Sequence, residues 1–196
     1  MRKQTTYKPD VTSRRNFLKT VGGGCAALLL YGGNAWANKN IWAVGRPEKD
    51  SELAEYARKR FLSHWNCSQA VMEALAPKYA SGRDWTIAVD AACPFSAGMG
   101  KGLTCGSFTA AYMAIGLAHS ALPTWFNHYA INDVIERVLE FDKAATAEFK
   151  TLNCNELHGQ DMSTPEGRSK AGKAGQFTSI CPRTVVLAVN ETLKIN

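Results

Sequence analysis

The sequence predicts an all-α fold, a single-domain helical bundle that follows a cleaved N-terminal leader. Apolar residues recur at steps of three and four in several segments, which is the period of an amphipathic helix. Prolines and glycine-rich stretches stand between these segments, where helices begin and end. About 159 of the 196 residues remain once the leader is removed, enough for one domain with a core of its own.

Residues 1–37 have the three parts of an export signal. The basic region contains SRRNFLK, whose paired Arg14 and Arg15 resemble the twin-arginine signal that the export machinery recognises. A short apolar stretch diluted by three glycines follows, and NAWA, ending at Ala37, gives an A-x-A cleavage pattern. We therefore expect the twin-arginine export machinery to move the folded chain to the periplasm, with cleavage near Ala37. A retained N-terminal helix is the alternative.

Composition argues against two other classes. The apolar stretch of the leader is shorter than the roughly 20 residues that cross a membrane. No later stretch is long and apolar enough, so no membrane span is expected in the mature form. The leader holds six of the 23 Lys and Arg residues and one of the 17 acidic residues, which leaves the mature chain nearly neutral. Nucleic-acid binding needs clustered positive charge and is therefore not expected.

Residues 38–50 contain Gly and Pro but no sustained period, so we expect a linker to a helical four-cysteine domain over residues 51–196. The first helix begins near Asp50, and NCSQAVMEALAPKYA forms the second. RDWTIAVDAAC forms a short third helix that runs into the glycine-rich loop FSAGMGKGLTC. GSFTAAYMAIGLAHSAL forms the fourth, with small residues at four-residue spacing from Gly106 to Ala118 that let a neighbour approach its backbone.

Pro123 is expected to open a longer helix, whose apolar stripe includes Ile135 and extends toward Phe149. The polar segment HGQDMSTPEGRSKAGKAGQFTS is predicted to be a loop. Cys181 and Pro182 then begin the last helix, since proline suits the first helical position. The β-branched residues of RTVVLAV leave a strand open as the alternative, although a helix is favoured.

Five cysteines remain after the leader, and an odd number cannot all pair within one chain. Cys67, Cys105 and Cys181 are each predicted at or just before a helix N-terminus, where the helix dipole favours a thiolate. Cys154 is predicted at the end of the long helix, with His158 one turn further on.

Cys93 lies inside an apolar run, which predicts a buried thiol outside the site. An enzyme with a cysteine nucleophile is the least favoured class. His64 stands three residues before Cys67, but no carboxylate that would orient its ring is evident in the sequence.

NCSQAV, TCGSFTAAYMAIGL, LNCNELHG and ICP together resemble the C_GCAxxG_C_C family of redox-active proteins, over roughly residues 51–193. This resemblance implies redox activity or an iron-sulfur cluster. By motif, the cofactor-binding and metal-ligating positions carry over to Cys67, Cys105, Cys154 and Cys181. The sequence departs from the motif at two positions: Ser107 replaces an Ala, and Ala110 replaces a Gly.

The spacing of the cysteines ranks the possible cofactors independently. Structural zinc sites usually contain C-x₂₋₄-C pairs, and these four cysteines form none. Covalent haem needs C-x-x-C-H, which is also absent, although split-Soret cytochrome c resembles the same family. A helical bundle can still converge four distant thiolates on an iron-sulfur cluster. Metal-free thiol-disulfide chemistry and a disulfide-braced binding module stay open as alternatives.

Export in the folded state favours a cofactor inserted before export, because disulfides form after export and need no prior folding. We therefore expect a periplasmic redox domain that holds an iron-sulfur cluster or another thiolate-bound metal. It would exchange electrons with a partner protein that the sequence does not identify. A homodimer and an enzymatic activity both stay open.

The leader generates the first testable prediction. Replacing Arg14 and Arg15 by Lys should leave uncleaved precursor in the cytoplasm, because the export receptor recognises the arginine pair. Intact mass and N-terminal sequencing of cell fractions check this, and the parent protein in the periplasm should begin at Asn38. Undiminished export of the double-lysine chain, or periplasmic protein that keeps Met1, would contradict the prediction.

Overall fold

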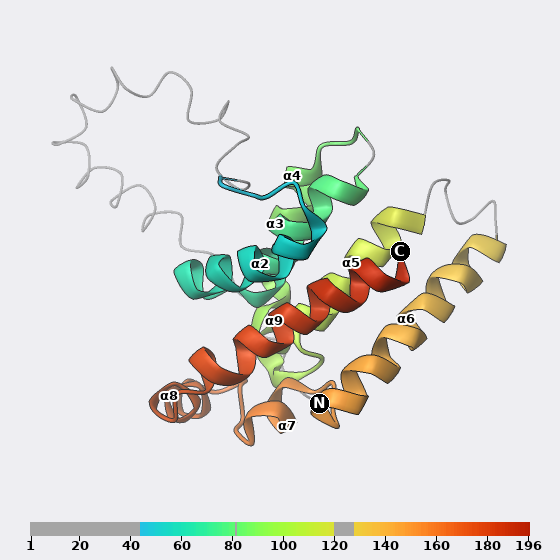
Figure 1. Ribbon diagram of the computed structural model, residues 1–196. Helices are drawn as coiled ribbons and strands as arrows, with labels where there is room; N and C mark the ends of the chain where they lie inside the picture. Colours follow the sequence, from blue (N-terminus) through green and yellow to red (C-terminus); the bar gives the residue numbers. More distant parts are fainter. Residues whose placement is uncertain (1–43, 81, 120–127) are drawn as a thin grey trace, which may run out of the picture. The chain divides into compact units, whose positions relative to one another are not determined.

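The computed structural model describes residues 44–80, 82–119 and 128–196, and these residues are all-α, as the sequence predicts (Figure 1). Within them the chain forms no strand ladder, and none of the helices is long and apolar enough to cross a membrane. The elements are α2 (Asp50–His64), α3 (Cys67–Tyr79), α4 (Trp85–Ala92), η2 (Cys93–Phe95), η3 (Gly98–Gly102), α5 (Gly106–His119), α6 (His128–Phe149), α7 (Cys154–His158), α8 (Pro165–Lys173) and α9 (Gln176–Ile195).

Helix α3 is the centre of the bundle and packs against α2, α4, α5 and α9. Every residue from Cys67 to Ala76 is buried, which is the pattern of a helix enclosed on all sides. The small residues predicted on α5 explain how closely α3 and α5 pack, because Gly106, Ala110 and Ala114 are all buried. The methyl group of Ala110 is therefore accommodated in the core.

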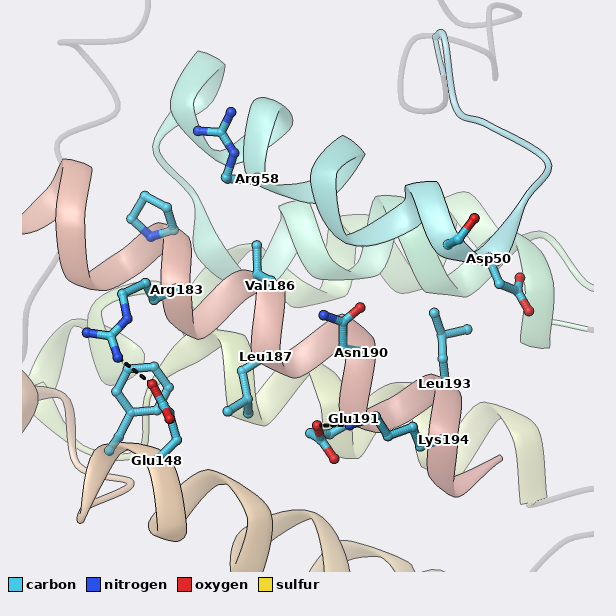
Figure 2. Close-up of a pocket in the computed structure, with 13 residues that line it drawn as sticks. Asp50, Arg58, Glu148, Arg183, Val186, Leu187, Asn190, Glu191, Leu193 and Lys194 are labelled. Atoms are coloured by element: carbon cyan, nitrogen blue, oxygen red, sulfur yellow. Dashed lines mark hydrogen bonds and ion pairs between the residues drawn. The ribbon is translucent and has the colours of Figure 1, made fainter.

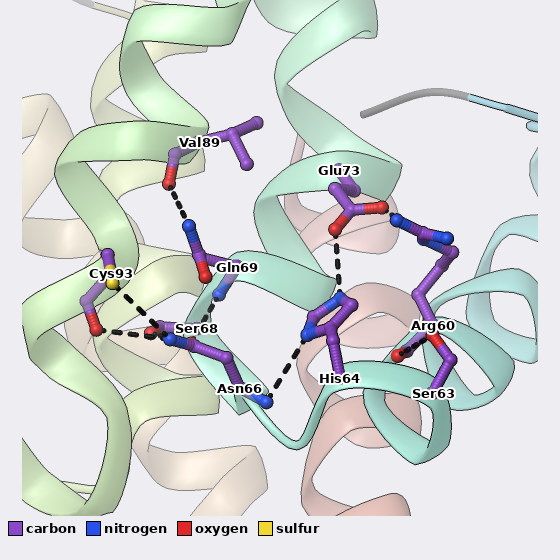
Figure 3. Close-up of polar contacts among 9 residues, drawn as sticks. All are labelled: Arg60, Ser63, His64, Asn66, Ser68, Gln69, Glu73, Val89 and Cys93. Atoms are coloured by element: carbon purple, nitrogen blue, oxygen red, sulfur yellow. Dashed lines mark hydrogen bonds and ion pairs between the residues drawn. The ribbon is translucent and has the colours of Figure 1, made fainter. Parts of the chain in front are cut away.

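Polar residues of α3 are buried together with partners from neighbouring elements. The Ser68 hydroxyl donates to the carbonyl oxygen of Ala92 at 2.7 Å. Gln69 Nε2 donates to the carbonyl oxygen of Val89 at 3.3 Å (Figure 3). A buried polar group without a partner is destabilising, so these bonds fix α4 against α3 at a defined position.

Glu73 is the one carboxylate among the buried polar residues of the described chain, and α2 supplies its partners. Arg60 donates to Glu73 Oε2, and His64 Nε2 lies 2.9 Å from Oε1 (Figure 3). The second contact does not have hydrogen-bond geometry in the structure. The Glu73 side chain is fully buried, whereas Arg60 is 25% exposed. The carboxylate therefore ties the end of α2 to the middle of α3.

Two predicted helix boundaries are wrong. The polar segment predicted to be a loop contains α8, which begins at Pro165, and the Thr164 side chain caps it by accepting from Gly167 N at 3.0 Å. Helix α9 begins at Gln176, so Pro182 lies inside the helix and not at its start. The choice of helix over strand for RTVVLAV is confirmed.

Helix α6 ends at Phe149 and not at Cys154, where the sequence predicted its end. Phe141 is fully buried against Tyr112 at a ring distance of 5.7 Å. Ile135, expected on the buried stripe, is instead 49% exposed. The predicted opening of this helix at Pro123 lies outside the described residues, as does the predicted signal at 1–37.

A groove of about 580 Å³ lies along the seam between α2 and α9 (Figure 2). Its floor contains Val186 and Leu187 of α9, and charged side chains such as Arg58 and Arg183 stand at its rim. None of the described cysteines lines this groove, so it is separate from the thiol chemistry considered below.

The buried carboxylate generates a stability prediction. Arg60→Ala should lower the free energy of unfolding by roughly 3 kcal/mol, because it leaves the buried charge of Glu73 with less compensation. Arg58→Ala is the matched control, since Arg58 pairs with Glu55 on the exposed face of the same helix and its loss should matter little. Urea denaturation of both variants checks this, and equal effects would contradict the prediction.

Candidate functional site

Three of the four motif cysteines begin helices. Cys67 is the first residue of α3, Cys105 immediately precedes α5, and Cys154 is the first residue of α7, not the end of the long helix as predicted. These three are buried. Cys181 is half-buried and lies inside α9, so its predicted place at a helix N-terminus is wrong.

The segments that carry Cys105 and Cys154 run antiparallel to each other. Cys105 N donates to the carbonyl oxygen of Leu152 at 2.8 Å, and Cys154 N donates to that of Leu103 at 2.6 Å. An isolated antiparallel bridge between the intervening residues lies at the centre of this pairing. Two cysteines far apart in the sequence are therefore joined through their own backbones.

The thiols of Cys67 and Cys105 lie close enough for each to shift the pKa of the other. Gly106 permits this contact. A Cβ atom at this position would lie 2.8 Å from Cys67 Sγ and 2.7 Å from the carbonyl oxygen of Phe95, closer than real Cβ atoms come. The glycine that follows the second motif cysteine is thus required by the approach of the first.

Donors around Cys67 favour its thiolate. The hydrogen bond from Cys105 lowers the pKa of Cys67 to about 6 and more than offsets the opposing effect of burial. The Ser96 hydroxyl, the Ala97 backbone N–H and the Ser107 hydroxyl contribute in the same direction. The same bond, together with burial, raises the pKa of Cys105 well above its ordinary value. The negative charge of the pair therefore sits on Cys67.

Ser107 thus has a definite role where this chain departs from the motif. Besides its bond toward Cys67, its hydroxyl lies 3.1 Å from Thr184 Oγ1 of α9. The sequence shows the added hydroxyl but not the group that it contacts. Ser96 and Ala97 were not predicted, because nothing local distinguishes them from other residues of the glycine-rich loop.

The remaining two thiols lie within the electrostatic reach of Cys67. Burial raises the pKa of Cys154 to about 12, and the charge of Cys67 adds to the effect. Burial and the same charge raise the pKa of Cys181, with a further contribution from Cys154. Across the described residues, no three His, Cys, Asp or Glu side chains are grouped so as to hold a metal ion. The four thiols share one neighbourhood without forming a tight ligand cage.

His158 is held beside Cys181. Its Nε2 lies 3.5 Å from Cys181 Sγ, and its Nδ1 lies 3.3 Å from Gln176 Oε1. Burial lowers the pKa of His158, so the ring is neutral at pH 7. The Gln176 oxygen can only accept, which places the ring proton on Nδ1 and leaves Nε2 as the acceptor toward the thiol.

A cavity of about 350 Å³ reaches this neighbourhood, and Cys67, Cys154 and His158 line it. Its volume lies within the range of roughly 300–1,000 Å³ that is usual for small-molecule sites. Two of the four motif thiols are therefore open to a cavity, although both are almost fully buried.

The prediction that Cys93 is a buried thiol is wrong, because this residue is exposed. Helix α4 buries Val89 and Ala92, and Cys93 follows at the start of η2 on the outer side. Its carbonyl oxygen accepts from Asn66 Nδ2 at 3.2 Å. Cys93 is not among the residues that line the cavity.

Glu73 is the orienting carboxylate for His64 that sequence analysis did not find. With Nε2 directed to Glu73, the Nδ1 atom of His64 lies 3.3 Å from the backbone nitrogen of Asn66 and accepts from it (Figure 3). Both ring nitrogens are thus engaged away from Cys67. Asn66 in turn caps α3 by accepting from Gln69 N at 3.0 Å. His64 therefore positions the start of α3 and does not serve as a base for Cys67.

The fold and the site define a small all-α protein built around four neighbouring cysteines, one of which is a stabilised thiolate. The chain belongs to the family described as "Putative redox-active protein (C_GCAxxG_C_C)", whose sequence pattern matches residues 65–195. No curated protein and no solved structure matched the chain. The family membership confirms the resemblance found in the cysteine motifs.

The thiolate at Cys67 generates a reactivity prediction. In reduced, metal-free protein, the rate at which iodoacetamide alkylates Cys67 should rise with pH around a midpoint of about 6, because the thiolate is the nucleophile. Ser107→Ala should move this midpoint to higher pH, since the thiolate loses a donor. Peptide mass spectrometry across a pH series measures both.

Ser179→Ala is the matched control, because its hydroxyl bonds to the Gly175 carbonyl oxygen and is not a donor to Cys67. It should leave the midpoint unchanged. A parent midpoint near the ordinary value of roughly 8.5 would contradict the assignment of the thiolate.

Proposed function

We propose that this protein is an exported redox protein whose four motif cysteines form one redox centre. When loaded, the centre holds an iron-sulfur cluster or another thiolate-bound metal. The observation that carries the proposal is the mutual electrostatic influence of the thiols. The charge of Cys67 reaches Cys105, Cys154 and Cys181, which supports placing the four thiols in one neighbourhood of the fold.

The donor set fits this group. Thiolate sulfur is the usual ligand of iron-sulfur clusters, and four cysteines complete such a ligand set. Burial of three of the four thiols would keep solvent away from the centre.

Each residue has a separable role in this proposal. Cys67, Cys105, Cys154 and Cys181 would be the ligands, and a bound cluster would supply reversible one-electron transfer. Cys67 is already a thiolate, the form that binds metal. The interaction with Cys67 keeps Cys105 protonated, and burial keeps Cys154 and Cys181 protonated. Binding of a cluster would therefore release protons from Cys105, Cys154 and Cys181. His158 Nε2 can accept the proton from Cys181.

A second candidate, metal-free thiol-disulfide chemistry, is favoured by one specific observation. Cys67 and Cys105 contact each other directly, one as thiolate and one as thiol. Oxidation would join the two sulfur atoms in a disulfide, release the Cys105 proton and pass two electrons to an oxidised partner. The low pKa of Cys67 makes it the attacking sulfur in the reverse exchange with a partner's disulfide.

The proposal includes export of the folded protein by the twin-arginine route. The machinery carries folded chains, which is consistent with a centre assembled in the cytoplasm and used in the periplasm. The cluster would then exchange electrons with a partner protein in that compartment.

The cluster and dithiol candidates predict different outcomes for single serine variants. If the four cysteines hold a cluster, replacing any of Cys67, Cys105, Cys154 or Cys181 by Ser should sharply reduce iron and acid-labile sulfide, because hydroxyl oxygen is a poor ligand for such iron. Protein prepared anaerobically from cells that assemble clusters is assayed for iron, sulfide, free thiols and visible absorption.

Cys93→Ser is the matched control and should keep the iron content of the parent, because Cys93 is exposed and does not line the cavity. Iron-free parent protein that forms one disulfide between Cys67 and Cys105 would overturn the cluster and establish the dithiol chemistry. Loss of iron from Cys93→Ser alone would contradict the ligand assignment.

A further inference from the structure

The cavity beside Cys67 and Cys154 is lined by several kinds of side chain besides the two thiols. Aromatic and thioether side chains form much of its wall, contributed by Phe61, Trp65, Met162 and Phe177. Its polar groups are few. Besides the thiols they include Ser96, His158 and Arg168. An apolar wall with a small number of placed polar groups is the usual composition of a site for a small organic molecule.

The exposed fractions of the lining residues show which end of the cavity is buried and which end opens to solvent. Cys67, Cys154 and His158 are almost fully buried, at 7%, 4% and 4% exposed, whereas Trp65 is 52% exposed. Arg168 is half-buried. The thiols therefore lie at the inner end of the cavity, and Trp65 and Arg168 lie toward its mouth.

The aromatic walls are fixed in position by their own packing. Trp65 meets Phe61 edge to face at 5.6 Å, and Phe177 meets the His158 ring in the same way at 5.8 Å. Rings held in this manner present rigid apolar surfaces, which suit a flat, apolar guest.

Backbone strain is concentrated on the same cavity. Trp65 and Ala97 both line it, and both adopt left-handed conformations, with φ of 59° and 54°. A bulky residue such as Trp rarely takes this conformation, and glycine would take it without cost. Trp65 closes α2 by donating its N–H to the Phe61 carbonyl oxygen at 2.7 Å. Strained residues gather at functional sites, where the side chain is needed despite the strain.

The charge at the mouth is positive. Arg168 is always protonated, and within the described part of the chain one of its donors is hydrogen-bonded, from Nη1 to the carbonyl oxygen of Met162 at 2.7 Å. Asp161 lies close enough to interact with Arg168, but it is fully exposed to solvent and does not line the cavity. Among the described residues that line the cavity, Arg168 is the one arginine or lysine. An anionic group would therefore bind at the mouth, beside Arg168.

We propose that this cavity binds a planar aromatic molecule with one anionic group, of the quinone class, which accepts electrons from the thiols. The ring system would lie between the aromatic walls, with its anionic group beside Arg168 and its far edge toward Cys67. Binding itself rests on the cavity alone. The electron step rests on the proposed redox function in its dithiol form.

The electron step balances without another reactant. The Cys67 thiolate and the Cys105 thiol form a disulfide and give up two electrons and one proton. The quinone takes both electrons and that proton and leaves as the singly protonated hydroquinone anion. Charge is conserved, because the negative charge of the thiolate becomes that of the hydroquinone anion and the anionic group of the ligand is unchanged.

Two probes separate binding from electron transfer. Anthraquinone sulfonate is planar, anionic and reducible, and naphthalene sulfonate is planar and anionic but is not a quinone. With reduced, anaerobic, metal-free exported protein, isothermal titration calorimetry should show saturable one-to-one binding of both probes. Free-thiol counting should show loss of the Cys67 and Cys105 thiols with the quinone only.

Variants at the mouth test the site itself. Arg168→Gln should weaken binding of both probes about tenfold, the usual effect of losing a charge-assisted hydrogen bond. Arg168→Lys should keep most of the affinity. Arg183→Gln is the matched control, because Arg183 lines the separate groove between α2 and α9, and it should change nothing.

Trp65→Gly separates a binding role from a structural one. Glycine accepts the left-handed conformation of this position, so the thermal midpoint should not fall, while affinity for both probes should fall severalfold. A fall in the thermal midpoint with unchanged affinity would show that Trp65 is structural and would overturn the proposed wall.

The remaining outcomes distinguish this inference from the proposed function. No saturable binding of either probe, or equal losses in Arg168→Gln and Arg183→Gln, would overturn the cavity even if the cysteines prove redox-active. If both probes bind, and Arg168→Gln but not Arg183→Gln weakens their binding, the cavity is upheld as a binding site. If the quinone then fails to oxidise the thiols, the electron step is refuted.

Discussion

The enclosure of α3 is the constraint on which the rest of the structure depends. A helix buried on every side cannot leave polar groups unpaired, because each unpaired group would lose its hydrogen bonds to water without replacement. Ser68 and Gln69 therefore bind α4, and Glu73 binds α2 through Arg60 and His64. The polar residues of α3 thus fix the elements around it.

The enclosure of α3 also fixes the position of the Cys67 thiol. Cys67 is the first residue of α3, so the bonds that hold the start of the helix also hold its thiol. His64 joins Glu73 to the backbone of Asn66, and Asn66 caps the helix. The buried ion pair therefore acts on the site indirectly, by fixing the residue next to Cys67. Its contribution is positional, since neither Glu73 nor His64 lines the cavity.

Burial alone would protonate all four thiols, because moving a charge out of water is costly. It has this effect at Cys154 and Cys181. Cys67 is the exception and favours the thiolate, because several donors stabilise its charge. These are Cys105, Ser96, Ser107 and the backbone N–H of Ala97. One charged sulfur among three neutral ones gives the site a defined starting state, and the adjoining cavity reaches that sulfur.

The sequence by itself determined the all-α class, the extent of α2, α3 and α4 and the four motif cysteines, because helical periodicity and motif spacing are local properties. It also indicated Gly106, but not that this glycine makes room for Cys67 Sγ. The helix α8 was missed because a polar, glycine-containing segment lacks an apolar period, and its cap at Thr164 is a weak signal.

Only the tertiary structure decided which residues meet. The pairing of Leu103–Cys105 with Leu152–Cys154 depends on two distant loops that meet just before the first residue of α5. The partnership of His64 with Glu73 depends on the packing of α2 against α3. The exposure of Cys93, in an apolar run that predicted burial, depends on which side of α4 faces the core. Such contacts are set by the free energy of the whole packed chain, and no local pattern encodes them.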